Sequence, residues 1–179
     1  MTYSSQPALD VYQKPDGPVG IGGWLILPIL HLCGSIVLTL INLYGIVSEW
    51  SGIKAIIMGG NDKLVALRLP LAISSILGVA VLILACVCLY RLFARSPTVP
   101  RLMTFFYVGM VVATLGDVAA DNMMASILGS STDPDNVRDL LRVTVAAAIW
   151  IPYFNRSRRV ANTFRAREAA VDRKIGEVF

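Results

Sequence analysis

Four long apolar stretches run through this chain, separated by short polar connections. A helix needs about 20 mostly apolar residues to cross about 30 Å of hydrocarbon. The stretches at 22–47, 69–93 and 102–127 meet that requirement, and a fourth at 134–154 meets it only if Arg142 enters the membrane. We therefore predict an all-α integral membrane protein with four transmembrane helices in an antiparallel bundle.

The composition and length agree with a single membrane domain. Hydrophobic residues make up 55% and charged residues 16% of the 179 residues, which is too apolar for an ordinary soluble domain of this size. We expect a disordered cytoplasmic tail at 1–19, a four-helix membrane domain at 20–155 and a basic tail at 156–179. The net charge of +4 is interpreted as a topology signal, and nucleic acid is not a predicted partner.

Two prolines mark the predicted starts of helices. Pro70 is expected in the first turn of the second span, where its missing N–H costs least. Thr132 and Asp133 offer a cap before Pro134, which suits the first position of the fourth helix. That helix is therefore expected to begin near Pro134.

The distribution of Lys and Arg predicts the orientation, because basic residues in short loops stay in the cytoplasm. Eleven of them lie beside the inner ends of the predicted spans and five beside the outer ends. Both termini are therefore expected in the cytoplasm. The inner set is Lys14, Arg91, Arg95, Arg101, Arg156, Arg158, Arg159, Arg165, Arg167, Arg173 and Lys174, and the outer set is Lys54, Lys63, Arg68, Arg138 and Arg142.

A polar cluster is predicted in the outer half of the membrane. Asp117 and Asp121 share one face of the third span, and Arg142 is almost as far from the following turn as Asp121. We therefore expect Asp121 and Arg142 to pair. Counting helical rise brings three further polar residues to a similar depth, namely Asn42, Ser74 and Ser75.

Two interpretations of this cluster remain open. In the first, the Asp121–Arg142 pair only joins the last two helices, and we favour this interpretation. In the second, Asp117 and Asp121 form a proton or cation site, because two close carboxylates repel each other and one of them then takes up a proton readily.

The sulfur and imidazole side chains predict no cofactor. His31, Cys33, Cys86 and Cys88 fall at similar depths, but neighbours two apart project from different sides of a helix. At most one residue from each helix can face a common point. We expect His31 to be hydrogen-bonded to a neighbouring backbone or hydroxyl group.

The C-terminal tail has the pattern of an amphipathic helix in the plane of the membrane. Its apolar stripe consists of Val160, Phe164, Val171, Ile175 and Val178. Anionic phospholipid is the predicted contact, with a larger membrane complex or a merely solvated tail as alternatives. The residues assigned to this contact are Arg156, Arg158, Arg159, Phe164 and Arg165.

Two segments resemble the ends of a known family. The opening GIGGWLIL and the closing IWIPYFNRSRRVANTF look like the two signature ends of a bacterial inner-membrane family named only as domain of unknown function 2569. The resemblance covers about residues 20–164. It implies a four-span protein of the bacterial cytoplasmic membrane and implies no activity, so no catalytic residue is carried over.

The sequence holds no phosphate loop, nucleophile elbow or zinc helix, and an enzyme is therefore not predicted. The favoured hypothesis is a non-enzymatic accessory, assembly or scaffold subunit of a bacterial inner-membrane complex. The alternative is a small transporter or channel-like protein, linked to protons or cations, that uses Asp117 and Asp121.

Overall fold

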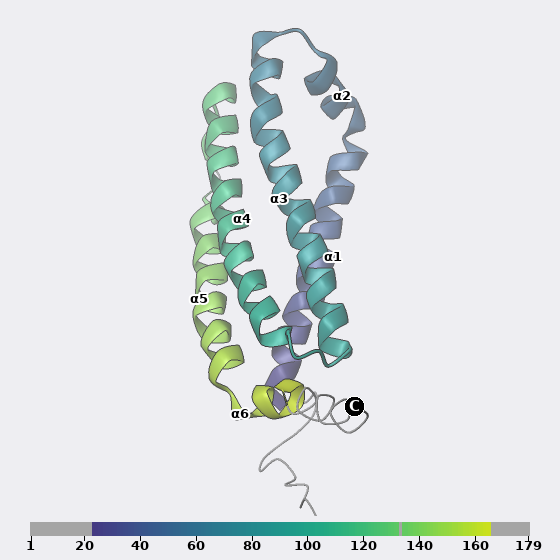
Figure 1. Cartoon of the computed structure of the whole chain (residues 1–179). Coiled ribbons are helices and arrows are strands. Elements are labelled where there is room, and N and C mark those ends of the chain that lie inside the picture. The colour runs from purple at the N-terminus through teal and green to yellow at the C-terminus, as the bar shows by residue number, and fades with distance from the viewer. Residues whose placement is uncertain (1–22, 133, 166–179) are drawn as a thin grey trace, which may run out of the picture.

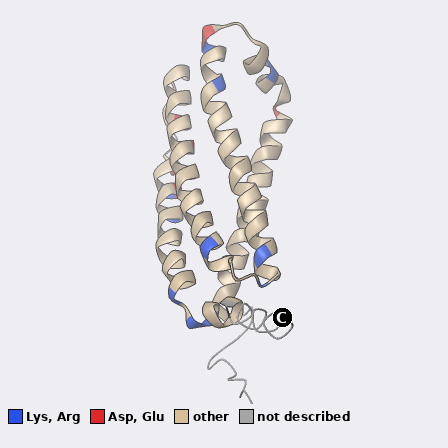
Figure 2. Ribbon diagram, in the orientation of Figure 1, with Lys and Arg blue, Asp and Glu red and all other residues tan. Residues whose placement is uncertain are grey.

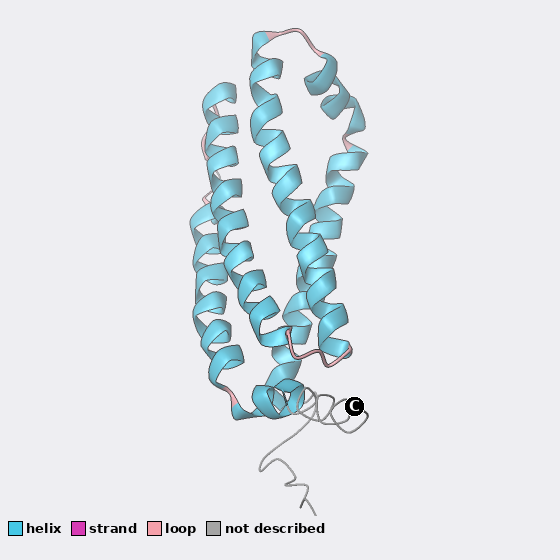
Figure 3. Ribbon diagram, in the orientation of Figure 1, coloured by secondary structure: helices cyan, strands magenta, loops and turns pink. Residues whose placement is uncertain are grey.

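The computed structural model describes residues 23–132 and 134–165 (Figure 1). All elements within these ranges are helical (Figure 3), which confirms the all-α prediction. The predicted tail at 1–19 and the stripe residues Val171, Ile175 and Val178 lie outside the described residues. The elements are η1 Gly23–Leu25, α1 Ile26–Ser48, α2 Trp50–Met58, α3 Asp62–Phe93, α4 Val99–Leu128, α5 Asp135–Arg156, α6 Arg158–Val160 and the π-helix η2 Ala161–Arg165.

The long helices α1, α3, α4 and α5 run alternately in opposite directions (Figure 1). Helix α3 packs against α1 and α4, and α4 packs against α5. The short helix α2 connects α1 to α3 at one end of the bundle, which we call the α2 end. The opposite end, the α6 end, carries η1, the connection between α3 and α4, and α6.

Three helical segments are long and apolar enough to cross a membrane, which indicates a membrane protein. They are Gly23–Ser48 (η1 and α1), Asp62–Phe93 (α3) and Val99–Leu128 (α4). The fourth predicted span corresponds to α5, whose first half carries Asp135, Arg138, Asp139 and Arg142. By the same measure α5 is too polar to count as a span, so the structure supports three crossings by length and composition.

Helix α3 begins earlier than predicted. Asn61 caps its start, because its Oδ1 accepts a hydrogen bond from the backbone N–H of Lys63 at 3.0 Å. Pro70 therefore lies inside the helix and not in its first turn. The prediction for Pro70 was wrong because the span was taken to begin after Arg68, which left out two helical turns that also carry Asp62 and Lys63.

Helix α2 was not predicted, and an arginine holds its end. The guanidinium of Arg68 donates from Nε to the carbonyl of Ile56 at 2.9 Å and from Nη2 to that of Gly59 at 2.7 Å. These carbonyls lie at the end of α2, where no intrahelical partner is available. Arg68, counted above only as a topology signal, thus attaches α2 to α3.

The tightest packing lies toward the α6 end. Leu25, Phe154, Val160 and Phe164 belong to one buried cluster there, with residues of α3 and α4. The assignment of Phe164 to a lipid or partner contact was wrong, because its side chain is fully buried. Within the described residues the tail folds back under the bundle. The first two residues of its apolar stripe, Val160 and Phe164, are part of the buried core.

Candidate functional site

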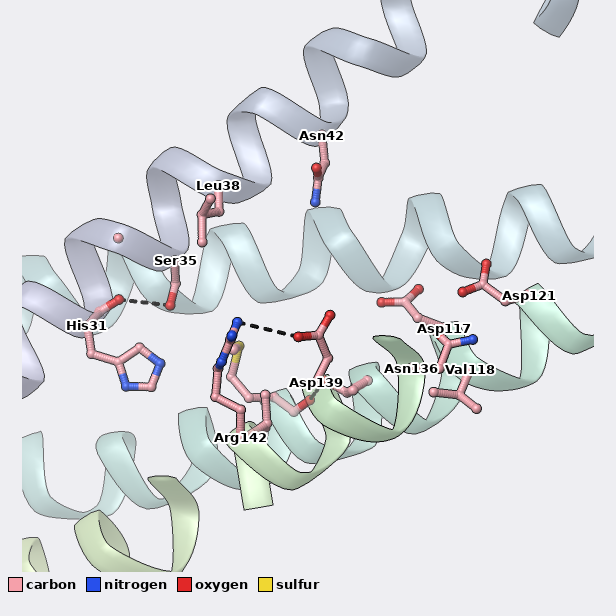
Figure 4. A pocket seen from close by; sticks show the side chains of 14 residues that line it. His31, Ser35, Leu38, Asn42, Asp117, Val118, Asp121, Asn136, Asp139 and Arg142 are labelled. Carbon is pink, nitrogen blue, oxygen red and sulfur yellow. Dashed lines mark hydrogen bonds and ion pairs between the residues drawn. The ribbon is translucent and has the colours of Figure 1, made fainter. Parts of the chain in front are cut away.

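A polar cavity of about 570 Å³ lies between α1, α4 and α5 (Figure 4). The cavity lies beside the middle of α1 and of α4. Both helices are among the three segments that are apolar enough to cross a membrane. Polar side chains from all three helices face it. The residues that line it are His31, Gly34, Ser35, Leu38, Asn42, Met110, Thr114, Asp117, Val118, Asp121, Asn136, Asp139, Arg142 and Val143.

Helical spacing explains why these residues meet. On α1, His31, Ser35, Leu38 and Asn42 follow one another at intervals of three or four residues and so share a face. The same spacing joins Thr114, Asp117 and Asp121 on α4, and Asn136, Asp139 and Val143 on α5. Each helix thus presents one mostly polar stripe to the cavity.

Asp117 and Asp121 form the acidic end of the cavity. Both are half-buried, and the Ser74 side chain of α3 lies within hydrogen-bonding reach of Asp117. In the described part of the chain neither carboxylate forms an ion pair. Beside them, the amide nitrogen of Asn136 is buried and has no hydrogen-bond partner. This end of the cavity therefore has two carboxylates, with a buried and unpaired donor next to them.

Arg142 lies toward the other end of the cavity and pairs with its own helix. Its Nη1 is 3.4 Å from Oδ1 of Asp139, and Figure 4 shows this pair between His31 and Asp117, with Asp121 farthest away. The predicted Asp121–Arg142 pair is therefore wrong. Helix α5 begins partway along α4 (Figure 1). The connection between the two helices contains non-helical chain, which advances about twice as far per residue as a helix does. Arg142 is thereby carried past Asp121.

His31 contacts aromatic side chains of α4. Its Nδ1 is 3.4 Å from the hydroxyl oxygen of Tyr107, which confirms the expected hydroxyl partner. Its ring also meets Phe106 edge-on, with ring centroids 6.4 Å apart. The thiol of Cys88 donates to the carbonyl of Leu102 at 3.6 Å. Among the described residues no three His, Cys, Asp or Glu side chains come together as a metal site.

The structure brings together most of the predicted polar cluster. Asn42, Asp117, Asp121 and Arg142 all line the cavity, and Ser74 lies beside Asp117. Ser75 does not join them, because its hydroxyl donates to the carbonyl of Leu71 at 2.8 Å. Sequence reasoning missed Ser35, Asn136 and Asp139, although their three- and four-residue spacing from known members was a usable signal.

Several Lys and Arg residues lie at the α6 end (Figure 2). Arg156 and Arg158 are exposed there, and Arg159 is half-buried with its Nε unpartnered. The side chain of Arg165 lies outside the described residues. The exposed arginines remain available for the predicted contact with anionic lipid or a partner.

The chain matches a family model over most of its length. Residues 18–165 match the family described as "Protein of unknown function (DUF2569)". Comparisons with curated proteins and with solved structures find no match. The match includes η1 at its beginning and α6 at its end, so both signature segments that carried the resemblance fall inside it.

Proposed function

Because this chain belongs to the DUF2569 family, whose description names no activity, we propose its function from the geometry of the cavity. It is a small membrane transporter or channel-like protein, and it takes up a proton or a cation at Asp117 and Asp121. The observation that carries this proposal is the cavity itself, in which two carboxylates lie within apolar helices and pair with no cation among the residues that the structure describes. The proposal assigns no catalytic residue.

The formal charges of the cavity favour a cation. Three carboxylates and one guanidinium line it, and the Asp139–Arg142 pair is neutral as a unit. Two negative charges remain on Asp117 and Asp121. Ionisable groups inside membranes mark ion pathways and proton relays, since keeping a charge there costs about 2.5–3.5 kcal/mol on insertion scales. A bound cation or proton removes that cost.

The proposal includes four crossings with both termini in the cytoplasm of a bacterial cell. The 22 residues of α5 are long enough, at about 33 Å, to cross beside α4. Both ends of the described chain lie at the α6 end, as an even number of crossings requires (Figure 1). The gathering of Lys and Arg at that end supports a cytoplasmic position for it.

A second candidate is an accessory or assembly subunit of a larger membrane complex. It is favoured by the exposure of the Asp139 and Arg142 side chains, which are 57% and 66% accessible along α5. A charged pair facing hydrocarbon is unfavourable, and a partner helix placed over α1 and α5 would cover it. The exposed arginines at the α6 end would then bind anionic lipid or the partner.

Ion flux in proteoliposomes tests the first candidate. We expect the purified protein to carry proton or monovalent cation current, and Asp117→Asn and Asp121→Asn to abolish that current while remaining inserted. Asp62→Asn is the matched control, since Asp62 is exposed in the first turn of α3 and outside the cavity. Current that survives both cavity substitutions would contradict the proposal.

Purification from native membranes in mild detergent tests the second candidate. A stoichiometric partner that cross-links to a cysteine placed at Asp139, and not to one placed at Leu69 on the exposed face of α3, would support the accessory role. A protein that purifies alone, conducts cations and loses conduction with Asp121→Asn would exclude it.

A further inference from the structure

The size and lining of the cavity point to the class of cation that it binds. A bare metal ion needs several oxygen ligands converging within about 2.6 Å. Asp117 and Asp121 are one turn apart on the same helix, and the described residues hold no cluster of three metal-binding side chains. The volume of about 570 Å³ falls instead within the range of small-molecule sites.

Apolar and polar groups alternate around the cavity in a way that suits an organic molecule. Leu38, Met110 and Val143 supply apolar surface from each of the three helices. The two carboxylates at the acidic end accept hydrogen bonds, and they match the three N–H donors of a primary ammonium group. An alkyl chain would extend from that group along the apolar surface.

A second helix supplies an independent indication of a ligand. The amide nitrogen of Asn136 on α5 is buried without a partner, and a buried donor left unpaired costs about 1–3 kcal/mol. Figure 4 shows the Asn136 side chain on the side of the cavity that holds Asp117. Asn136 also lines the cavity, so a rotation of its side chain would let the amide donate to an oxygen atom that lies close to the ammonium group of the ligand.

Arg142 does not oppose such a ligand. Its guanidinium is paired with Asp139 and lies toward His31, away from Asp121. The positive charge of the ligand therefore meets two carboxylates without a neighbouring cation. We propose that the cavity binds a primary organic ammonium ion that has a short alkyl chain and an oxygen acceptor; this inference rests on the proposed cation site at Asp117 and Asp121.

Binding to the purified full-length protein in detergent tests the inference. The probes form a matched series of equal chain length: 1-aminopentan-2-ol (aminopentanol below), whose hydroxyl lies beside the ammonium group, pentylamine and pentyltrimethylammonium, with NaCl and MgCl₂ as inorganic controls. We expect saturable binding of aminopentanol, weaker binding of pentylamine and none of pentyltrimethylammonium, which lacks N–H donors. Asp121→Asn should weaken aminopentanol binding about tenfold or more, because a charge-assisted hydrogen bond is lost, and Asp62→Asn should not.

The contribution of Asn136 to binding is measured with a separate variant. Asn136→Leu should bring the affinity for aminopentanol down to that for pentylamine and leave pentylamine unchanged. Equal binding of all three organic cations, or tighter binding of Mg²⁺ or Na⁺, would overturn the inference. If inorganic cation current is present without amine binding, only the ligand class is wrong. If amines bind and no current of any kind is found, the site stands and the transport function fails.

Discussion

Gly23 and Arg159 meet at the α6 end, where the tip of the Arg159 side chain occupies the space that a side chain on the glycine would need. A Cβ at Gly23 would lie 2.6 Å from Nη1 of Arg159, and the backbone there has a φ of +56°. Only glycine adopts that conformation at little cost. The two segments that carried the family resemblance thus meet at this residue pair as well as in the buried cluster of Leu25, Phe154, Val160 and Phe164.

Replacing Gly23 by alanine should lower the free energy of unfolding by about 1–2 kcal/mol, because the left-handed backbone is strained and Arg159 must move. Gly129→Ala is the matched control, since Gly129 has a φ of +69° but no atom within 4 Å of the added Cβ. Thermal unfolding in detergent measures both. An equal loss in the two variants would show that the contact with Arg159 contributes nothing.

The pairing of Arg142 makes a second prediction at this scale. A double-mutant cycle on Asp139 and Arg142 should give a coupling energy of about 0.3–0.5 kcal/mol, typical of exposed pairs on one helix. The cycle on Asp121 and Arg142 should give none. A coupling above about 1 kcal/mol between Asp121 and Arg142 would restore the pairing first predicted from the sequence.

Helix α2 depends on one side chain of its neighbour. Arg68→Ala removes both hydrogen bonds to the end of α2, and we expect faster amide hydrogen exchange over residues 50–60 with little change in α4. Lys54→Ala is the control, because Lys54 is an exposed basic residue of α2 itself. Unchanged exchange in Arg68→Ala would mean that apolar contacts alone hold α2.

The elements of the bundle were predictable to different degrees. The apolar runs located α1, α3 and α4 because a membrane helix must be long and continuous. The start of α3 escaped because Asp62, Lys63 and Arg68 interrupt its apolar run, and α2 escaped because its nine residues are too few to span a membrane. Asn61 before Asp62 was a readable cap, whereas the bonds from Arg68 join segments that only tertiary folding brings together.

The proposed topology, with four crossings of the membrane, can be measured on the whole molecule. Reporter fusions that are active only in the cytoplasm should be active after Phe179 and inactive within the connection at Gly60. Substituting Arg156, Arg158 and Arg159 by glutamine should weaken the orientation, since it removes three basic residues from the α6 end. An inactive fusion at Phe179 would indicate three crossings and leave α5 on the outer side.

The sequence predicted which residues form the candidate site better than it predicted how they pair. Asp117 and Asp121 stood out because charges are rare in apolar helices, and both line the cavity. The partner of Arg142 did not follow from counting residues, because the count assumed helical rise through a connection that is not helical. Asp139, three residues before Arg142, was the nearer partner.

The contact between Gly23 and Arg159 also bears on how the chain is made. Synthesis produces η1 and α1 long before α6, so Leu25 lacks its contacts with Phe154, Val160 and Phe164 until the chain has been made as far as η2. A chain that stops after α4 keeps that apolar surface open, and membrane proteases recognise such surfaces. We expect a chain ending at residue 132 to be degraded faster than the full-length chain in a pulse–chase experiment, so that incomplete copies do not accumulate in the cell.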